Sequence, residues 1–188
     1  VIIKEVGGAE IDSFTISDQK VSIINNNVVS ISSTTKVSDK QYTVIIKPNC
    51  LRDIFNNDFA GIVENNWKFN TTDTLPPTAN FTPPDNAIDV PNSTNLSITF
   101  SENVTKGTTG SITIIKTSSS STVETIPISS TNITVNGKNV TINITPLNDL
   151  TAYHVNIGAT CFKDASGNFY SGISDTTTWN FVTIDTTS

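Results

Sequence analysis

Two short acidic loops carry the side chains best suited to binding a metal ion. Asp164 is followed four positions later by Asn168, and Asp53 is followed at the same spacing by Asn57. Calcium takes about six to eight oxygen ligands, whereas each loop offers one carboxylate and one side-chain amide. The spacing therefore favours a turn closed by the Asp on its own backbone, with no metal ion and no cofactor. Calcium binding near Asp53 or Asp164 is the alternative. A further acid such as Glu102 could supply another ligand, but the sequence alone does not place it beside Asp164.

The side chains suited to nucleophilic chemistry are few and do not form a catalytic pattern. Cys50 and Cys161 occupy equivalent points of an internal repeat, so they lie a whole domain apart, whereas a disulfide needs Cα atoms within about 7 Å. We expect two free thiols packed as small apolar side chains. His154 is the single histidine, and strand alternation directs it to solvent if Tyr153 points inward. Neither a Gly-x-Ser-x-Gly elbow nor a carboxylate pair is present, so we expect no catalytic residues and no enzyme.

Two tryptophans raise the question of sugar binding, because aromatic faces stack on pyranose rings. Trp67 and Trp179 are each followed two positions later by Phe. Side chains at this spacing in a strand share a face, which predicts that both tryptophans lie in the core or at its edge. If the protein binds glycans, the loop aromatics Phe169 and Tyr170 are the better candidates.

An internal repeat determines where these residues lie in the fold. The residues that recur in order are Tyr42, Cys50, Asp53, Asn57, Gly61, Trp67 and Phe69, matched by Tyr153, Cys161, Asp164, Asn168, Gly172, Trp179 and Phe181. The offset is 111 residues at the first of these pairs and 112 at the last. The alignment extends backward, pairing Ile2-Ile3-Lys4 with Ile114-Ile115-Lys116 and Ile16-Ser17 with Ile128-Ser129.

The repeat predicts the domain boundaries. Residues 74–184 form a complete copy, and residues 1–73 form a copy without its first strands, because the first copy has no counterpart of residues 75–109. Asp185-Thr186 repeats Asp73-Thr74, so residues 185–188 are expected to open the linker to a further repeat. The first copy would expose its inner face and unpaired strand edges. We expect upstream residues, or strand exchange with another chain, to complete it.

Short strands separated by turns account for most of the complete copy. Apolar and polar residues alternate in several runs, as in half-buried strands, at residues 95–100, 111–116, 122–128, 133–135, 140–144, 152–157 and 177–182. Asn136-Gly137 favours a tight hairpin. Leu150 to Tyr153 matches a tyrosine corner, with Val37 to Tyr42 as its counterpart. The predicted fold is all-β, with tandem immunoglobulin-like antiparallel β-sandwiches, the first truncated at its N-terminus.

The motifs of the complete copy resemble, in order, those of the bacterial immunoglobulin (Ig)-like domain of the SbsA type. They are Pro83–Pro91, Ser97–Val104, Leu150–Val155, Lys163–Asn168 and Trp179–Phe181. The resemblance spans nearly all of residues 75–184. In the first copy, Asn56 stands where the family pattern has Gly. That family occurs in S-layer proteins, adhesins and secreted enzymes, usually in tandem. The resemblance implies an extracellular or cell-surface location, with neighbouring Ig-like repeats, other surface proteins or glycans as partners.

Composition excludes two classes of partner. Only 15% of residues are charged and the formal net charge is −6, without a basic stripe that could neutralise phosphates. We therefore expect no nucleic-acid binding. No apolar run approaches the roughly 20 residues that span a bilayer, so we expect no membrane insertion either. With the repeat, these features predict a non-catalytic structural or adhesive spacer. The alternative is a ligand-binding module, for carbohydrate or protein, attached to a secreted enzyme.

Overall fold

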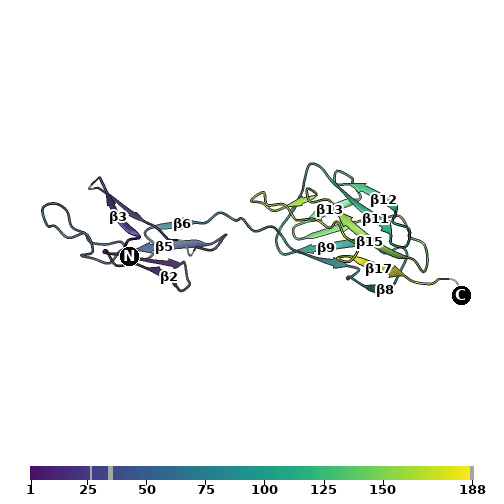
Figure 1. The fold of residues 1–188 in the computed structure, drawn as a ribbon, viewed down its shortest axis with the longest axis horizontal. Coiled ribbons are helices and arrows are strands. Elements are labelled where there is room, and N and C mark those ends of the chain that lie inside the picture. The colour runs from purple at the N-terminus through teal and green to yellow at the C-terminus, as the bar shows by residue number, and fades with distance from the viewer. Residues whose placement is uncertain (26, 34–35, 187–188) are drawn as a thin grey trace. The chain divides into compact units, whose positions relative to one another are not determined.

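The structure is a computed structural model that describes residues 1–25, 27–33 and 36–186, so residues 187 and 188 of the expected linker lie outside it. The described residues form strands and no helix, as the abundance of β-branched side chains favours. They divide into two compact units, Val1–Thr74 (unit 1) and Leu75–Ser188 (unit 2), both drawn in Figure 1.

The described residues of unit 1 form six strands, all paired antiparallel. They are β1 (Ile2–Glu5), β2 (Glu10–Ser13), β3 (Val21–Ile24), β4 (Val28–Ile31), β5 (Gln41–Ile45) and β6 (Lys68–Asn70). One sheet has the order β2-β1-β5-β6, and β3 and β4 form a separate hairpin. The buried apolar residues of unit 1 form one cluster, made of Val1, Ile3, Phe14, Tyr42, Val44 and Ile46.

Unit 2 is a β-sandwich. Its strands are β7 (Ala79–Thr82), β8 (Ala87–Val90), β9 (Leu96–Phe100), β10 (Thr105–Lys106), β11 (Ser111–Lys116), β12 (Ser121–Pro127), β13 (Ile133–Asn136), β14 (Asn139–Ile142), β15 (Ala152–Ile157), β16 (Phe162–Lys163) and β17 (Asn180–Thr183). A five-stranded sheet, β12-β11-β15-β17-β8, is accompanied by a four-stranded sheet, β13-β14-β9-β7, and by the short pair β10-β16. The sandwich is antiparallel as predicted, except that β17 and β8 pair in parallel.

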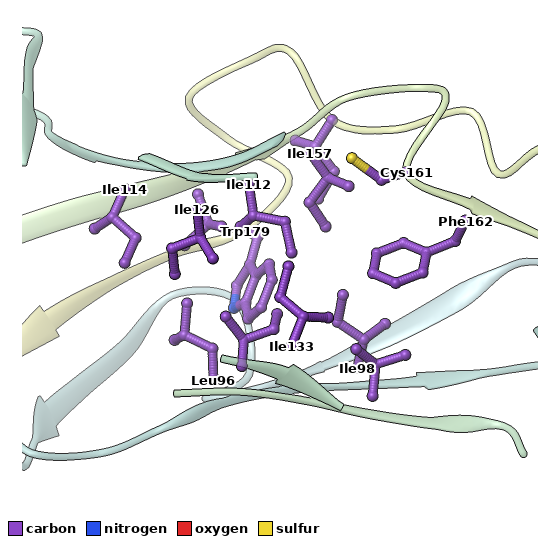
Figure 2. Close-up of a cluster of buried hydrophobic side chains, with 14 of the residues drawn as sticks. Leu96, Ile98, Ile112, Ile114, Ile126, Ile133, Ile157, Cys161, Phe162 and Trp179 are labelled. Atoms are coloured by element: carbon purple, nitrogen blue, oxygen red, sulfur yellow. The ribbon is translucent and has the colours of Figure 1, made fainter. Parts of the chain in front are cut away.

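The core of unit 2 is formed by the inward residues of both sheets, as Figure 2 shows. Leu96 and Ile98 of β9 face Ile112 of β11 and Ile126 of β12, and the ring of Trp179 lies between them. All these side chains are at most 2% exposed. Strand alternation therefore supplies two complementary apolar faces, and burying them against each other stabilises the unit.

Strand register corrects one part of the sequence alignment. Ile3 pairs with Val44, and Ile114 pairs with Val155, which is the counterpart of Val44. Ile3 thus takes the place of Ile114, and the pairing of Ile2-Ile3-Lys4 with Ile114-Ile115-Lys116 is wrong by one residue. A slip of one residue turns every side chain of a strand to the other face. Ile3 is buried whereas Ile2 is half-buried, as the corrected register requires.

The predicted hairpin at Asn136-Gly137 exists, but its turn lies one residue later. Asn136 pairs with Asn139, so the two loop residues are Gly137 and Lys138. Gly137 has φ +60°. Glycine at the first loop position is what a type II′ turn requires, since this turn needs positive φ there.

Both predicted tyrosine corners are confirmed. The backbone N–H of Asn148 donates to the Tyr153 hydroxyl at 3.1 Å, and that of Val37 donates to the Tyr42 hydroxyl at 2.8 Å. Each bond spans five residues and fixes the loop that leads into the central strand, β15 or β5. Tyr153 and Tyr42 are both buried, which makes a partner for the hydroxyl oxygen necessary.

Candidate functional site

The acidic loops form the closed turns that the sequence predicts. In unit 2, Asp164 Oδ1 accepts the backbone N–H of Asn168, and Oδ2 accepts the Asn168 side-chain amide, both at 2.8 Å. In unit 1, Asp53 makes the same two bonds with Asn57, at 2.9 and 2.8 Å. The main role of each carboxylate is therefore to hold its own loop.

The electrostatics of the two loops follow from these bonds. Burial acts to raise the pKa of Asp164, but hydrogen bonds from the side chain and backbone of Asn168 outweigh it and hold the pKa below its usual value. The side-chain amide of Asn57 makes the largest contribution to lowering the pKa of Asp53. Both carboxylates therefore stay ionised at neutral pH. Asn56 takes φ +69° where Gly167 takes +93°, so replacing the expected Gly keeps the turn, because Asn tolerates this region.

The fold brings Glu102 to Asp164, which the sequence left undecided. Carboxylate oxygens of these two residues lie within 4.8 Å of each other, although Glu102 follows β9 and Asp164 follows β16. The pairing of β10 with β16 joins these two segments. Two carboxylates supply only part of the six to eight or so oxygen ligands that calcium takes.

Both cysteines are free, as predicted. Cys161 is fully buried, and its Sγ lies 3.4 Å from the carbonyl oxygen of Ser111. Burial raises the pKa of the Cys161 thiol, which keeps it protonated and unreactive at neutral pH. Cys50 is only half-buried, although it packs against the core of unit 1.

The expectation that His154 is solvated is wrong. His154 lies on the opposite face of β15 from Tyr153, as alternation predicts, but it is only 3% exposed. β15 is a central strand, and His154 lies opposite Ile115 of β11 and Asn180 of β17. Its Nδ1 lies 3.1 Å from the hydroxyl oxygen of Thr117. Burial by strands on both sides leaves this imidazole without access to a substrate.

The prediction for the tryptophans holds in unit 2 and fails in unit 1. Trp179 is fully buried, stacks on Phe81 with ring centroids 4.6 Å apart, and donates its indole N–H to the carbonyl oxygen of Pro83 at 2.9 Å. Trp67 is 43% exposed. The two partners of Trp179, Phe81 and Pro83, come from the N-terminal part of unit 2.

The aromatics considered for glycan binding also differ in environment. Tyr170 is buried, and its ring packs edge-on against Phe100 at 5.3 Å. Phe169 is exposed, with the ammonium of Lys163 5.9 Å from its ring centroid. A platform for a sugar ring would therefore rest on Phe169 without Tyr170.

Two open hollows lie on the described surface. The hollow in unit 2, of about 330 Å³, is lined mainly by small polar residues that include Ser111, Thr113 and Asn156. The hollow in unit 1, of about 390 Å³, has a mixed lining of four apolar residues, Ile23, Val29, Leu51 and Phe59, and five polar or charged ones, Asn27, Arg52, Asp53, Asn57 and Asp58. His154 lines neither of them.

One tightly held acid was missed from the sequence. Asp175 Oδ1 accepts the backbone N–H groups of Thr177 and Thr178, at 2.8 and 2.7 Å, and these bonds with the Thr178 hydroxyl lower the pKa of Asp175 to about 2. The run Asp-Thr-Thr-Thr is the available signal, because Asp followed by Thr two positions later commonly closes such a turn. The loop it fixes leads directly into Trp179.

The two facing sheets, the tyrosine corner and the core tryptophan define unit 2 as an Ig-like β-sandwich. A family model described as the bacterial Ig-like domain matches residues 73–183. The match covers more than half of the chain, so the chain belongs to the bacterial Ig-like domain family. A search of curated proteins finds no match.

Membership of this family indicates a general class of function. Its domains are non-catalytic and are typical of bacterial surface and secreted proteins, where they serve as structural or adhesive modules. None of the described residues belongs to a helix long and apolar enough to cross a membrane.

Proposed function

We propose that the chain is a stretch of a tandem array of SbsA-type Ig-like repeats, acting as a non-catalytic spacer in a cell-surface or secreted protein. Residues 1–73 are one copy without counterparts of its first strands, residues 74–184 are a complete copy, and residues 185–188 open the next linker. Neighbouring repeats are its main partners, and surface proteins or glycans are secondary ones.

The observation that carries this proposal is that both units repeat scaffold features. Each unit has a tyrosine corner, an Asp-Asn turn and a bulge at the same point of its first hairpin, between Ile3 and Lys4 and between Ile114 and Ile115. These features fix loops and strand register. Repetition of scaffold residues supports a role in which spacing matters.

Short Pro-rich junctions further support a spacer. Residues 71–77 contain Pro76-Pro77. Proline fixes φ and limits the bending of a linker, so successive copies in an array would keep their separation.

Small-angle scattering tests the proposal on a chain with both copies complete, made by placing residues 75–111 before Val1. We expect a radius of gyration well above the roughly 17 Å of a compact globule of that length. A value near that of a compact globule would argue against a spacer. A glycan array is the companion measurement, because binding that Phe169→Ala abolishes would favour the ligand-binding alternative.

A further inference from the structure

The first and last parts of unit 2 are joined by a parallel strand pair. β8 lies near the start of the unit and β17 at its end, with Phe181 opposite Ala87 and Thr183 opposite Val90. β8 is an edge strand of the five-stranded sheet, so β17 is its one partner among the described strands. The sheet therefore holds β8 through β17 alone.

Backbone hydrogen bonds extend this pairing beyond both ends of the strands. Before β8, the N–H of Asn86 donates to the carbonyl oxygen of Asn180 at 2.8 Å. After β17, the N–H of Ile184 donates to the carbonyl oxygen of Val90 at 2.9 Å. We call this set of contacts, between residues 85–90 and residues 180–184, the β8–β17 row.

A carboxylate reinforces the end of the row at which the chain enters. Asp85 Oδ1 accepts both the backbone N–H and the side-chain amide of Asn180, at 3.0 and 2.9 Å. Hydrogen bonds to an ionised acceptor are stronger than those between neutral groups. Asp85 and Asn180 therefore form the strongest single link of the row.

The direction of the two strands determines how the row responds to tension. The chain enters the row at Asp85 and leaves it at Ile184, and these residues lie at opposite ends because the strands are parallel. Tension between the two ends of the unit therefore pulls β8 backward and β17 forward, along the strands. In this shear geometry the hydrogen bonds of the row carry the force together, whereas strands peeled from one end lose their bonds one at a time.

The neighbouring strands direct the force onto this row. β7 precedes β8 and pairs with β9 along its whole length, Ala79–Thr82, so tension reaches that pair first. Once β7 is pulled away, the force passes directly to β8. β17 is held on its other side by β15, and the Thr183 hydroxyl donates to the carbonyl oxygen of Asn148 at 2.6 Å. The row is thus the last noncovalent link in the path between the two ends of the unit.

We propose that the β8–β17 row is a mechanical clamp that keeps unit 2 folded when tension is applied along the chain. Asp85 is its main side-chain contribution. The inference rests on the proposed spacer function, because tension reaches a module of an array through its two ends. It goes beyond that function, since a spacer that only sets a distance needs no shear-loaded link between its terminal strands.

Stretching of single molecules at constant force tests the proposal on the full chain, held by tags at its two ends. Unit 2 is recognised by the length that it releases, roughly 360–400 Å for residues 75–184 against roughly 240–270 Å for residues 1–74. The lifetime of the folded unit under force reports the rate of forced unfolding.

Two matched variants locate the clamp. Asp85→Ala should shorten the lifetime under force at least about tenfold, because two hydrogen bonds to a carboxylate are lost from the row. Glu124→Ala is the control. Glu124 Oε2 also accepts two bonds, from the N–H and hydroxyl of Thr145 at 3.0 and 2.8 Å, but it lies on β12, at the opposite edge of the sheet. Its effect should stay below about twofold.

A general loss of stability is separated from a loss of mechanical strength in the same experiment. Each lifetime under force is compared with the unfolding rate of the same variant in denaturant without force, so that an effect common to both cancels. Circular dichroism shows that each variant is folded before it is stretched.

Changing the points of attachment tests the geometry without removing a bond. Ser93 is exposed and follows β8. A handle on Ser93→Cys, in a chain with Cys50→Ser, and a second handle at the C-terminus pull on the same end of the row. The bonds then break one at a time, beginning at Val90, so the lifetime at equal force should be at least about tenfold shorter.

Either of two results would overturn the proposal. One is an equal effect of Asp85→Ala and Glu124→Ala on the lifetime under force after the correction for stability, and the other is a lifetime that does not depend on the points of attachment. Failure of the spacer proposal is seen separately, because a compact particle in scattering leaves the stretching results of unit 2 unchanged.

Discussion

Trp67 and Trp179 show how far one residue type depends on what packs beside it. Both begin a Trp-x-Phe pattern, and both backbone carbonyls accept a 2.9 Å bond from the neighbouring strand, from Val44 and Val155. Only Trp179 has Phe81 against its ring and the Pro83 carbonyl oxygen at its indole N–H. The main chain is thus equivalent at the two sites, while the environment of the ring is set by a segment distant in sequence.

Single-tryptophan variants measure this difference directly. We expect Trp67→Phe, which leaves Trp179, to emit at shorter wavelength and to resist acrylamide, because the remaining indole is fully buried. Trp179→Phe, which leaves Trp67, should emit at longer wavelength and be quenched readily. Circular dichroism of both variants is the control for folding. Equal quenching of the two folded variants would contradict the environments described.

At the scale of elements, a glycine in each unit allows a loop to run beside the central strand. Ile157 and Ile173 bond to each other through both backbone groups, as do Ile46 and Ile62. The preceding residue, Gly172 or Gly61, has φ +75° or +88°, and a Cβ added at either would lie 2.4 Å from a backbone oxygen. Only glycine fits this close approach, so the loop stays paired with the strand and extends the sheet.

Gly172→Ala should therefore destabilise unit 2 strongly. We expect its free energy of unfolding to fall by roughly 2–5 kcal/mol, since backbone overlap adds to the unfavourable φ. Gly167→Ala is the matched control: Gly167 also has positive φ, but an added Cβ meets nothing within 4 Å. Its loss should be roughly 1–2 kcal/mol, from φ alone. Equal losses for the two variants in denaturant titration would show that the close approach does not matter.

At the scale of the whole molecule, the two units have cores of unequal size. The described residues give unit 2 a cluster of 22 buried apolar residues, whereas unit 1 has 6. Hydrophobic stabilisation is roughly proportional to the apolar area removed from water. Each cluster consists of side chains from one unit, so neither core depends on side chains of the other unit.

The chain should consequently unfold in two transitions, with unit 1 first. A fragment of residues 73–188 should retain the second transition at the same denaturant concentration, within error, because it keeps the entire core of unit 2. Denaturant titration followed by circular dichroism makes this comparison. A single transition, or a fragment that unfolds much earlier than the chain, would show that the units stabilise each other.

Features that depend on near neighbours could be predicted from the sequence alone. Alternation in runs such as residues 111–116 predicts strands, Asp164 with Asn168 predicts a closed turn, and Leu150 to Tyr153 predicts a tyrosine corner. Each needs only a few consecutive residues, because the hydrogen bonds that close it are local. Cys50 and Cys161 occupy equivalent positions of the repeat, so they are expected to lie a whole domain apart. This separation is too large for a disulfide and predicts free thiols.

Features that depend on distant segments could be read only from the folded chain. Strands on both sides of β15 bury His154, the pairing of β10 with β16 brings Glu102 to Asp164, and the parallel pairing of β8 with β17 completes a sheet. The burial of Trp179 likewise depends on Phe81 and Pro83, which are distant from it in sequence. Local pattern sets which face of a strand a side chain occupies, but its burial depends on which strands lie beside it.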